Sequence, residues 1–364
     1  MRERGVSRVR EQRLRQGGLF VPLVFSFAAS LEQLTPEAFL ASATKASNGL
    51  RTVFASFDVD GVAGWCDDTA PADTLSCTLD WCTYPPAVVE APPPEVAPDL
   101  GRIGVAGATG VATDVVRRLG SLLPDTVLVG TMPGPVTLAR QLAGPGAGGP
   151  DSGDSTPGEG LERVRVAAKA CLAYAKALGD AGLDLLLVRE EALLVPTDGV
   201  SAGDIARLYS SIWNTARFYG LTALLALGGE GARDVVGGRH DARAGAGGPS
   251  AQSASAYSAA GLLALAGVVD GLVAPPALIE HWSDVLDHGF RRIGLALPAN
   301  LPAQPVDVID AYLRGHAVAE RMRDGRLFLV TTDGEVPPST DRAALLVGLM
   351  TIRDHVRGAG ARDA

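Results

Sequence analysis

Short apolar runs recur along the chain, and longer segments with helical spacing separate them. We interpret eight of these runs as strands: residues 19–27, 52–57, 126–130, 183–188, 222–227, 268–273, 292–297 and 326–330. Each run is almost continuously apolar, which is typical of parallel strands covered on both faces. The pattern therefore predicts a parallel sheet with helices packed against it.

The segments between these runs carry helix start and stop signals. Thr35, Pro36 and Glu37 combine an N-cap residue, a first-turn proline and an acid. Residues 160–182 and 201–220 keep helical spacing up to a glycine, and residues 307–322 and 341–356 are amphipathic. Eight strands alternating with helices predict a single (β/α)8 TIM-type barrel. The alternative, a doubly wound open sheet, lacks the G-x-G-x-x-G that would support a dinucleotide fold.

Three segments interrupt the alternation. Residues 58–107 contain SCTLDW and PPAVVEAPPPEVAPD, which predict a hairpin excursion and a proline-stiffened connection after the second strand. Residues 144–160 and 237–256 are rich in Gly, Ser, Pro and Ala, which predicts two flexible loops. For 237–256, a lid over the barrel mouth and a mobile insert without a role both stay open.

The arginine-rich start of the chain precedes the apolar run LFVPLVFSFAA, a layout that resembles a signal peptide. Pro22 and the lack of a small-residue cleavage site instead favour a basic helix that leads into a buried strand. We therefore predict a helical extension over residues 1–18 and a barrel domain over residues 19–364. No apolar run reaches the roughly 18–20 residues of a membrane span, so we expect no membrane partner.

Composition narrows the class of protein. The 364 residues are 47% hydrophobic and 20% charged, which fits one large folded domain. The chain has 32 basic and 41 acidic residues and a net charge of −9, which argues against binding to nucleic acid. Four cysteines do not make a disulfide scaffold and fit a reducing cytoplasm. Cys66, Cys77 and Cys82 lack zinc-finger spacing, so thiols without a metal are favoured.

In a (β/α)8 enzyme the chemistry lies at the C-terminal ends of the strands. The predicted strand ends collect acidic groups and one arginine: Asp58, Asp60, Arg189, Glu190, Glu191, Glu230, Asp333 and Glu335. Crowded carboxylates raise one another's pKa, which suits acid–base chemistry, or they bind a hard cation or an amine. Each acid could instead cap a helix or face water, and for Glu190 and Glu191 both interpretations stay open.

The segment GTMPGPVTLARQLAG (130–144) resembles the strand-end Gly-Pro-x-Thr-Leu-Ala segment of the uroporphyrinogen decarboxylase superfamily. That group also contains thiol- and corrinoid-dependent methyltransferases and cobalamin-independent methionine synthase. Three more stretches of the chain are similar to segments of this family. They are the stretch around Asp58, the stretch before and after LDLLLV, and LFLVTTDGEVPPSTDRAAL. The resemblance covers most of the chain and implies a (β/α)8 barrel.

Only some of the family's functional residues have a counterpart in this sequence. The resemblance places the decarboxylases' aspartate on Asp58, their tyrosine on Gln141, their serine on or near Glu191 and their C-terminal histidine within 331–335. FSFAASLEQL lacks their substrate-clamping arginine, so porphyrinogen decarboxylation is not expected. The methyltransferases' zinc-binding His-x-Cys pair falls on Ala226 and Gly228, and no cysteine follows Cys171. We therefore do not expect the family zinc site.

The leading hypothesis is methyl (one-carbon) transfer on a small organic substrate at the C-terminal mouth, without the family zinc site. Asp58, Glu190 and Glu191 would then be acid–base groups, and the two glutamates could also hold a divalent cation such as Mg²⁺. Arg189 would clamp a carboxylate or phosphate. The remaining candidate substrate-binding residues are Pro133, Gly134, Thr137, Gln141, Asp333, Glu335 and, on the flexible loop, His240.

Two alternatives stay open beside methyl transfer. One is a decarboxylase or lyase acting on a carbon acid, and the other is a non-catalytic binding or accessory subunit. A corrinoid or other partner protein, or a second copy of the chain, would fit the first hypothesis.

Overall fold

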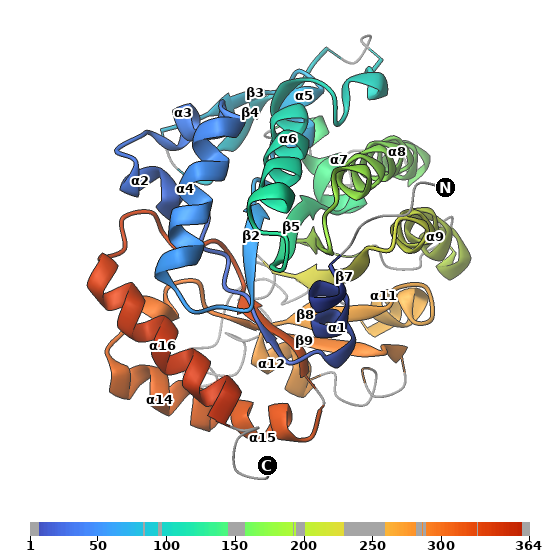
Figure 1. The fold of residues 1–364 in the computed structure, drawn as a ribbon. Coiled ribbons are helices and arrows are strands. Elements are labelled where there is room, and N and C mark those ends of the chain that lie inside the picture. Colours follow the sequence, from blue (N-terminus) through green and yellow to red (C-terminus); the bar gives the residue numbers. More distant parts are fainter. Residues whose placement is uncertain are drawn as a thin grey trace, which may run out of the picture.

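Eight parallel strands form a single, nearly closed barrel with helices around it (Figure 1). The computed structural model describes residues 7–82, 84–93, 97–144, 157–191, 193, 201–228, 259–281, 286, 289–325 and 327–358. In sheet order the strands are β1 (Leu19–Phe20), β10 (Leu327–Thr332), β9 (Arg292–Leu297), β8 (Gly271–Ala274), β7 (Thr222–Leu227), β6 (Leu185–Glu190), β5 (Val127–Pro133) and β2 (Gly61–Trp65). The predicted (β/α)8 barrel is confirmed.

The barrel is incomplete between β1 and β2, the two strands at the ends of the sheet order. The Asp60 backbone N–H donates to the Phe20 carbonyl over 3.0 Å, and the Phe20 N–H donates to Asp60 Oδ2 over 2.9 Å. One side chain thus supplies a contact that a longer strand would make with its backbone.

Helices follow most strands and cover the outside of the barrel (Figure 1). They are α1 (Arg8–Gln16), α2 (Phe27–Leu31), α3 (Pro36–Leu40), α4 (Ala43–Ser56), α5 (Ala70–Thr74), α6 (Gly107–Leu122), α7 (Pro135–Ala143), α8 (Pro157–Ala181), α9 (Ala202–Phe218), α11 (Ala259–Leu265), α12 (Pro276–His281), α14 (Val306–Gly315), α15 (Val318–Arg323) and α16 (Arg342–Gly358), with 3-10 turns η1 (Leu100–Arg102) and η2 (Leu301–Ala303). Among the helices described, none is long and apolar enough for a membrane crossing.

The predicted second strand is wrong. Residues 52–56 form the end of α4, which Ser42 caps by accepting a hydrogen bond from the Lys45 N–H. The strand itself is the glycine-containing segment GVAGW of β2. A Cβ on Gly61 would lie 2.7 Å from the Val127 carbonyl, so β2 and β5 can approach closely because this residue is glycine. Its low strand propensity hides it from the sequence pattern.

Several other predictions can be compared directly. The hairpin excursion after the second strand is confirmed as β3 (Thr78–Asp80) and β4 (Ala87–Glu90). The predicted loop 144–160 ends earlier, because α8 begins at Pro157. The amphipathic stretch 307–322 is two helices, because Ala317 adopts a left-handed backbone conformation with φ of 50°. Loop 237–256 lies outside the described residues.

The predicted basic helix before the first strand is present as α1, and it packs against the N-terminal end of the barrel. Arg10 is 6% exposed and donates through Nε to Asp184 Oδ2 over 2.8 Å, immediately before β6. Arg13 donates to the Asp60 carbonyl over 3.2 Å, immediately before β2. Helix α1 thus joins the starts of two strands that are not neighbours in the sheet.

Candidate functional site

The centre of the barrel mouth is occupied by Arg189 at the end of β6. Its Nη1 atom lies 2.6 Å from Asp68 Oδ2, and its Nη2 atom donates to the Asp333 carbonyl over 2.8 Å. Asp68 follows β2 and Asp333 follows β10, so the guanidinium connects three sides of the mouth. Both members of the Arg189–Asp68 pair keep 22% of their side-chain surface exposed, which leaves the pair within reach of a ligand.

Asp68 is a site residue that the sequence prediction missed. Its Oδ1 accepts a hydrogen bond from Thr131 Oγ1 over 2.7 Å, and its carbonyl accepts one from Gln141 Nε2 over 3.4 Å. These contacts tie Asp68 to β5 and α7 while its other oxygen holds Arg189. The guanidinium therefore has a fixed orientation, as expected of a group that recognises a ligand.

A small cavity lies below Arg189, inside the C-terminal end of the barrel. Its volume is about 10 Å³, close to the space of one water molecule. Arg189, Thr331, Thr332 and Asp333 line it together with Gly228 and apolar walls. The wall residues are Leu23, Leu187, Ala226, Leu227, Val273 and Ala296.

Two further acids at the mouth have strongly raised pKa values. Burial raises the pKa of Glu335 from 4.5 to about 8, although hydrogen bonding and the nearby Arg189 charge oppose the shift. Burial likewise raises the pKa of Asp67 from 3.8 to about 6. Glu335 is therefore largely protonated at neutral pH, and the mouth is less negative than its count of acids implies. It can serve as a proton donor.

Replacing Glu335 by glutamine should change the pH dependence of stability. Folding raises this pKa, so the group's favourable contribution is complete below about pH 4.5 and is lost as the pH rises through about 8. Glutamine imitates the protonated acid at every pH. We expect the free energy of unfolding of Glu335→Gln, relative to wild type, to rise by about 4 kcal/mol from about pH 5 to about pH 9.

Urea unfolding at several pH values checks this expectation. The control is Glu191→Gln, which makes the same substitution at an exposed glutamate. A flat difference for Glu335→Gln would contradict the raised pKa.

Glu190 is fully buried and faces helices outside the barrel, whereas its neighbour Arg189 faces the mouth. Its Oε1 accepts from the Val136 N–H over 3.0 Å and from the Tyr209 hydroxyl over 2.5 Å. Its Oε2 accepts from the N–H and the hydroxyl of Thr137 over 2.8 and 2.7 Å. Burial raises the pKa of Glu190 to about 7, against these hydrogen bonds. The geometry favours the helix-capping interpretation over acid–base work or cation binding.

The Gly-Pro-x-Thr turn is built around this carboxylate. A Cβ on Gly134 would lie 2.2 Å from Glu190 Cδ, so the turn requires glycine there. Pro135 begins α7, where its missing N–H costs nothing. Thr137 Oγ1 also accepts from the Glu191 N–H over 3.0 Å, and Glu191 itself is exposed. Pro133, also predicted here, accepts at its carbonyl from Cys171 Sγ over 3.3 Å.

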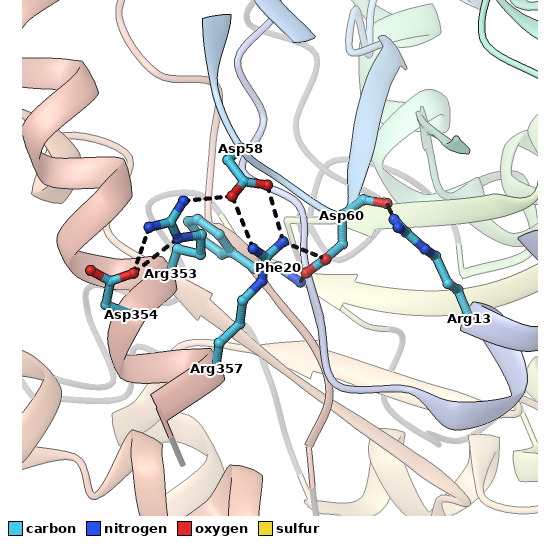
Figure 2. A network of polar contacts seen from close by, with 7 residues as sticks. All are labelled: Arg13, Phe20, Asp58, Asp60, Arg353, Asp354 and Arg357. Atoms are coloured by element: carbon cyan, nitrogen blue, oxygen red, sulfur yellow. Dashed lines mark hydrogen bonds and ion pairs between the residues drawn. The ribbon is translucent and has the colours of Figure 1, made fainter. Parts of the chain in front are cut away.

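Asp58 lies at the opposite end of the barrel from Arg189. Because the true second strand follows Asp58, this residue is at the N-terminal end, where it pairs with Arg353 Nη1 at 2.7 Å and Arg357 Nη1 at 3.1 Å (Figure 2). Hydrogen bonding to Arg357 lowers the pKa of Asp58. The same network includes Asp60, which lies 2.9 Å from Arg357 Nη2 (Figure 2). The predicted position of Asp58 and Asp60 at the mouth is therefore wrong.

Asp58→Asn should leave any activity at the mouth unchanged. Asp58 exposes 64% of its side chain, and exposed ion pairs contribute about 0–1 kcal/mol, so the free energy of unfolding should fall by less than about 1 kcal/mol. Thermal unfolding at low and high salt checks this, because salt screens the pairs and should shrink the difference. A loss of ligand binding in Asp58→Asn would restore the original assignment.

The structure describes the remaining predicted residues except His240 and Glu230, which lie outside the described residues. Gln141 reaches Asp68, and Asp333 Oδ1 accepts from the Ala299 N–H over 2.8 Å. Within the described part of the chain, no group of three or more His, Cys, Asp or Glu side chains is arranged to hold a metal ion. Ala226 and Gly228, the two positions at which the resemblance would place zinc ligands, have no side-chain group that binds zinc.

Comparisons with known proteins give matches of structure alone. No protein-family model and no curated protein sequence matches the chain. A methyltransferase from Methanosarcina mazei matches with a TM-score of 0.66 and 15% identity, over 96% of this chain and 98% of that one. The shared feature is the fold. This match agrees with the predicted (β/α)8 fold.

Two other solved structures match with lower scores that carry no weight here. A B12-independent methionine synthase from Shewanella sp. W3-18-1 has a TM-score of 0.44 and 11% identity, over 86% of this chain and 87% of that one. A D-tagatose 3-epimerase-like protein has a TM-score of 0.41 and 9% identity, over 95% of this chain and all of that one.

Proposed function

We propose that this protein is a divergent enzyme of the uroporphyrinogen decarboxylase superfamily that transfers a methyl or related one-carbon group. Its substrate is a small organic molecule bound at the C-terminal mouth, and the family zinc site takes no part. The observation that supports this most is the Arg189–Asp68 pair beside Glu335, on a barrel that aligns over its length with a methyltransferase fold. Fold alone does not select a reaction, so the mouth residues carry the proposal.

The chemistry assigned to these residues is simple. A nucleophilic atom of the acceptor forms a bond to the methyl carbon with its own lone pair while the donor–methyl bond breaks. The electrons of the broken bond stay on the donor, which then takes up a proton. Glu335 can supply that proton because its pKa of about 8 keeps it protonated at neutral pH. Arg189 binds an electron-rich oxygen of the substrate, and Asp68 keeps the guanidinium in place. A corrinoid or a corrinoid-carrying protein is a candidate partner for the methyl group.

Methyl transfer can be tested with ¹³C-methyl donors. The purified chain is incubated with labelled methylamines, methyl thioethers or methyltetrahydrofolate, and with a thiol or reduced cobalamin as acceptor. NMR should show the label on the acceptor, and Arg189→Gln should slow transfer by at least about tenfold. The control variant Arg217→Gln changes an arginine on α9 that pairs with Asp270 instead. Failure of every donor–acceptor pair would overturn the proposal.

A lyase or decarboxylase is the second candidate, favoured by the protonated Glu335 near Arg189. Loss of CO₂ from a carbon acid leaves a carbanion that needs a proton, and Glu335 could deliver it. A ¹³C-carboxyl label would then appear as bicarbonate instead of on an acceptor. If neither product forms, an accessory role without chemistry becomes the better explanation.

A further inference from the structure

Helix α16 carries an apolar stripe on its outer surface, formed by Ala343, Leu346, Val347 and Met350. Their spacing of three and four residues puts them on one face of the helix. Leu346, Val347 and Met350 are 38%, 49% and 44% exposed. Residues 343–352 include no charged side chain, although the outward face of a surface helix is normally polar. The stripe is therefore a candidate contact surface.

The surroundings of α16 keep the stripe on the outside. A Cβ on Gly348 would lie 1.9 Å from the Pro302 carbonyl oxygen, so the opposite face of α16 is pressed against η2. Two more exposed apolar side chains, Val306 and Val308, lie at the start of α14, which packs beside α16 (Figure 1). Residues 359–364, which follow α16, include no apolar side chain larger than alanine and cannot replace water over the stripe.

The two ends of the stripe carry opposite charges. Arg342 at the N-terminal end is exposed and has no ion pair within the described part of the chain. Its neighbour Asp341 caps the helix instead, by accepting from the Ala344 N–H over 2.9 Å. Asp354 at the C-terminal end exposes 66% of its side chain and pairs with Arg353 through Oδ1 alone. Its other oxygen is available to a cation from outside.

This arrangement is complementary to itself. Gly348 lies midway along the helix between Leu346 and Met350. It also lies midway between Arg342 and Asp354. A two-fold axis at the level of Gly348 would place the leucine of each copy at the level of the methionine of the other, and the arginine at the level of the aspartate. An antiparallel second copy of α16 therefore matches the stripe in both polarity and charge.

We propose that α16 and the start of α14 form the interface of a two-fold symmetric dimer, with the stripes of the two copies antiparallel. This inference goes beyond the proposed function and does not depend on it. Helices of 17 and 10 residues, about 10 Å wide, present about 400 Å² of surface. A standard interface buries about 800 Å² per partner, so this dimer exchanges with the monomer at micromolar concentrations.

Sedimentation velocity of the full chain from about 1 to about 100 µM tests the dimer. The wild-type protein should shift from one copy toward two as its concentration rises. Leu346→Glu puts two carboxylates into the apolar interface and should raise the Kd at least about tenfold. The matched control is Leu263→Glu, which makes the same substitution at a leucine of α11 that is 57% exposed, and it should leave the Kd unchanged.

A charge exchange tests the antiparallel arrangement and covers the case in which Leu346→Glu fails to fold. Arg342→Glu should raise the Kd severalfold, and adding Asp354→Arg should restore it. Both changes suit the helix dipole, so neither should weaken α16 itself. A monomer at every concentration would overturn the proposal and mean that another segment or another protein covers the stripe. A dimer that Leu346→Glu and Arg342→Glu both leave intact would place the interface elsewhere, and a loss that Asp354→Arg does not restore would refute the antiparallel packing.

Discussion

Glu190→Ala is expected to lower the free energy of unfolding by about 3–5 kcal/mol. The substitution leaves two backbone N–H groups at the start of α7, those of Val136 and Thr137, without their acceptor. It also removes one acceptor of the Tyr209 hydroxyl on α9 and opens a cavity at a fully buried position. Each buried donor left unpaired costs about 1–3 kcal/mol, so these losses outweigh the benefit of no longer burying a carboxylate.

Two further variants separate the capping role from a catalytic one. Glu190→Gln should still destabilise, by about 1–3 kcal/mol, because one of its amide N–H groups would face a backbone N–H. The neighbouring exposed residue provides the matched control, and Glu191→Gln should change stability by less than about 0.5 kcal/mol. Urea unfolding measures all three. If Glu190→Gln keeps wild-type stability and only loses activity or ligand binding, Glu190 is a catalytic group after all.

The sequence is sufficient to predict the architecture because most strands are buried on both faces. Runs such as LDLLLV and TALLAL are typical of parallel strands covered on both faces; they predict the bounds of β7 and place β6 two residues too early. The exception, GVAGW, is a strand because its glycines permit a close approach to β5. That requirement comes from a neighbour more than sixty residues away and leaves no local pattern.

This single error displaces part of the predicted site. Interpreting residues 52–57 as a strand puts Asp58 at the mouth, whereas the acids that follow the true strand are Asp67 and Asp68. Arg189 is correctly predicted to lie at the mouth because the strand that carries it, β6, is correctly predicted. The prediction groups Glu190 with the mouth acids, although successive side chains of a strand point to opposite faces. Strict use of this alternation within LDLLLVRE is enough to separate Arg189 from Glu190.

The partners of the mouth residues could not be predicted. Thr131, Gln141 and Asp333 reach Asp68 or Arg189 from three different elements, and no spacing in the sequence links them. The raised pKa of Glu335 likewise depends on burial by segments distant in the chain. Sequence patterns thus locate the mouth, while tertiary contacts decide which acids are charged there.

Arg10→Met is expected to cost about 3–5 kcal/mol of unfolding free energy, at the end of the barrel opposite the mouth. Arg10 and Asp184 are 6% and 4% exposed, and methionine would fill a similar volume while removing the guanidinium that pairs with the buried Asp184 carboxylate. The Leu128 N–H would still donate to Asp184 Oδ2, over 2.8 Å in the wild type, but this hydrogen bond offsets only part of the lost interaction with Arg10. Arg15→Met is the control on the same helix, since Arg15 is 77% exposed and pairs with Glu11 of α1.

A double-mutant cycle identifies the origin of this loss. If the cost comes from the lost partner of a buried charge, Asp184→Asn in the Arg10→Met background should recover about 1–3 kcal/mol, because the neutral amide can still accept from Leu128. Chemical unfolding of the four proteins gives the coupling energy. Additive single effects would mean that Arg10 acts through its packing alone. A strong coupling would mean that α1, although it precedes the first strand, closes the barrel through one ion pair and is part of the fold.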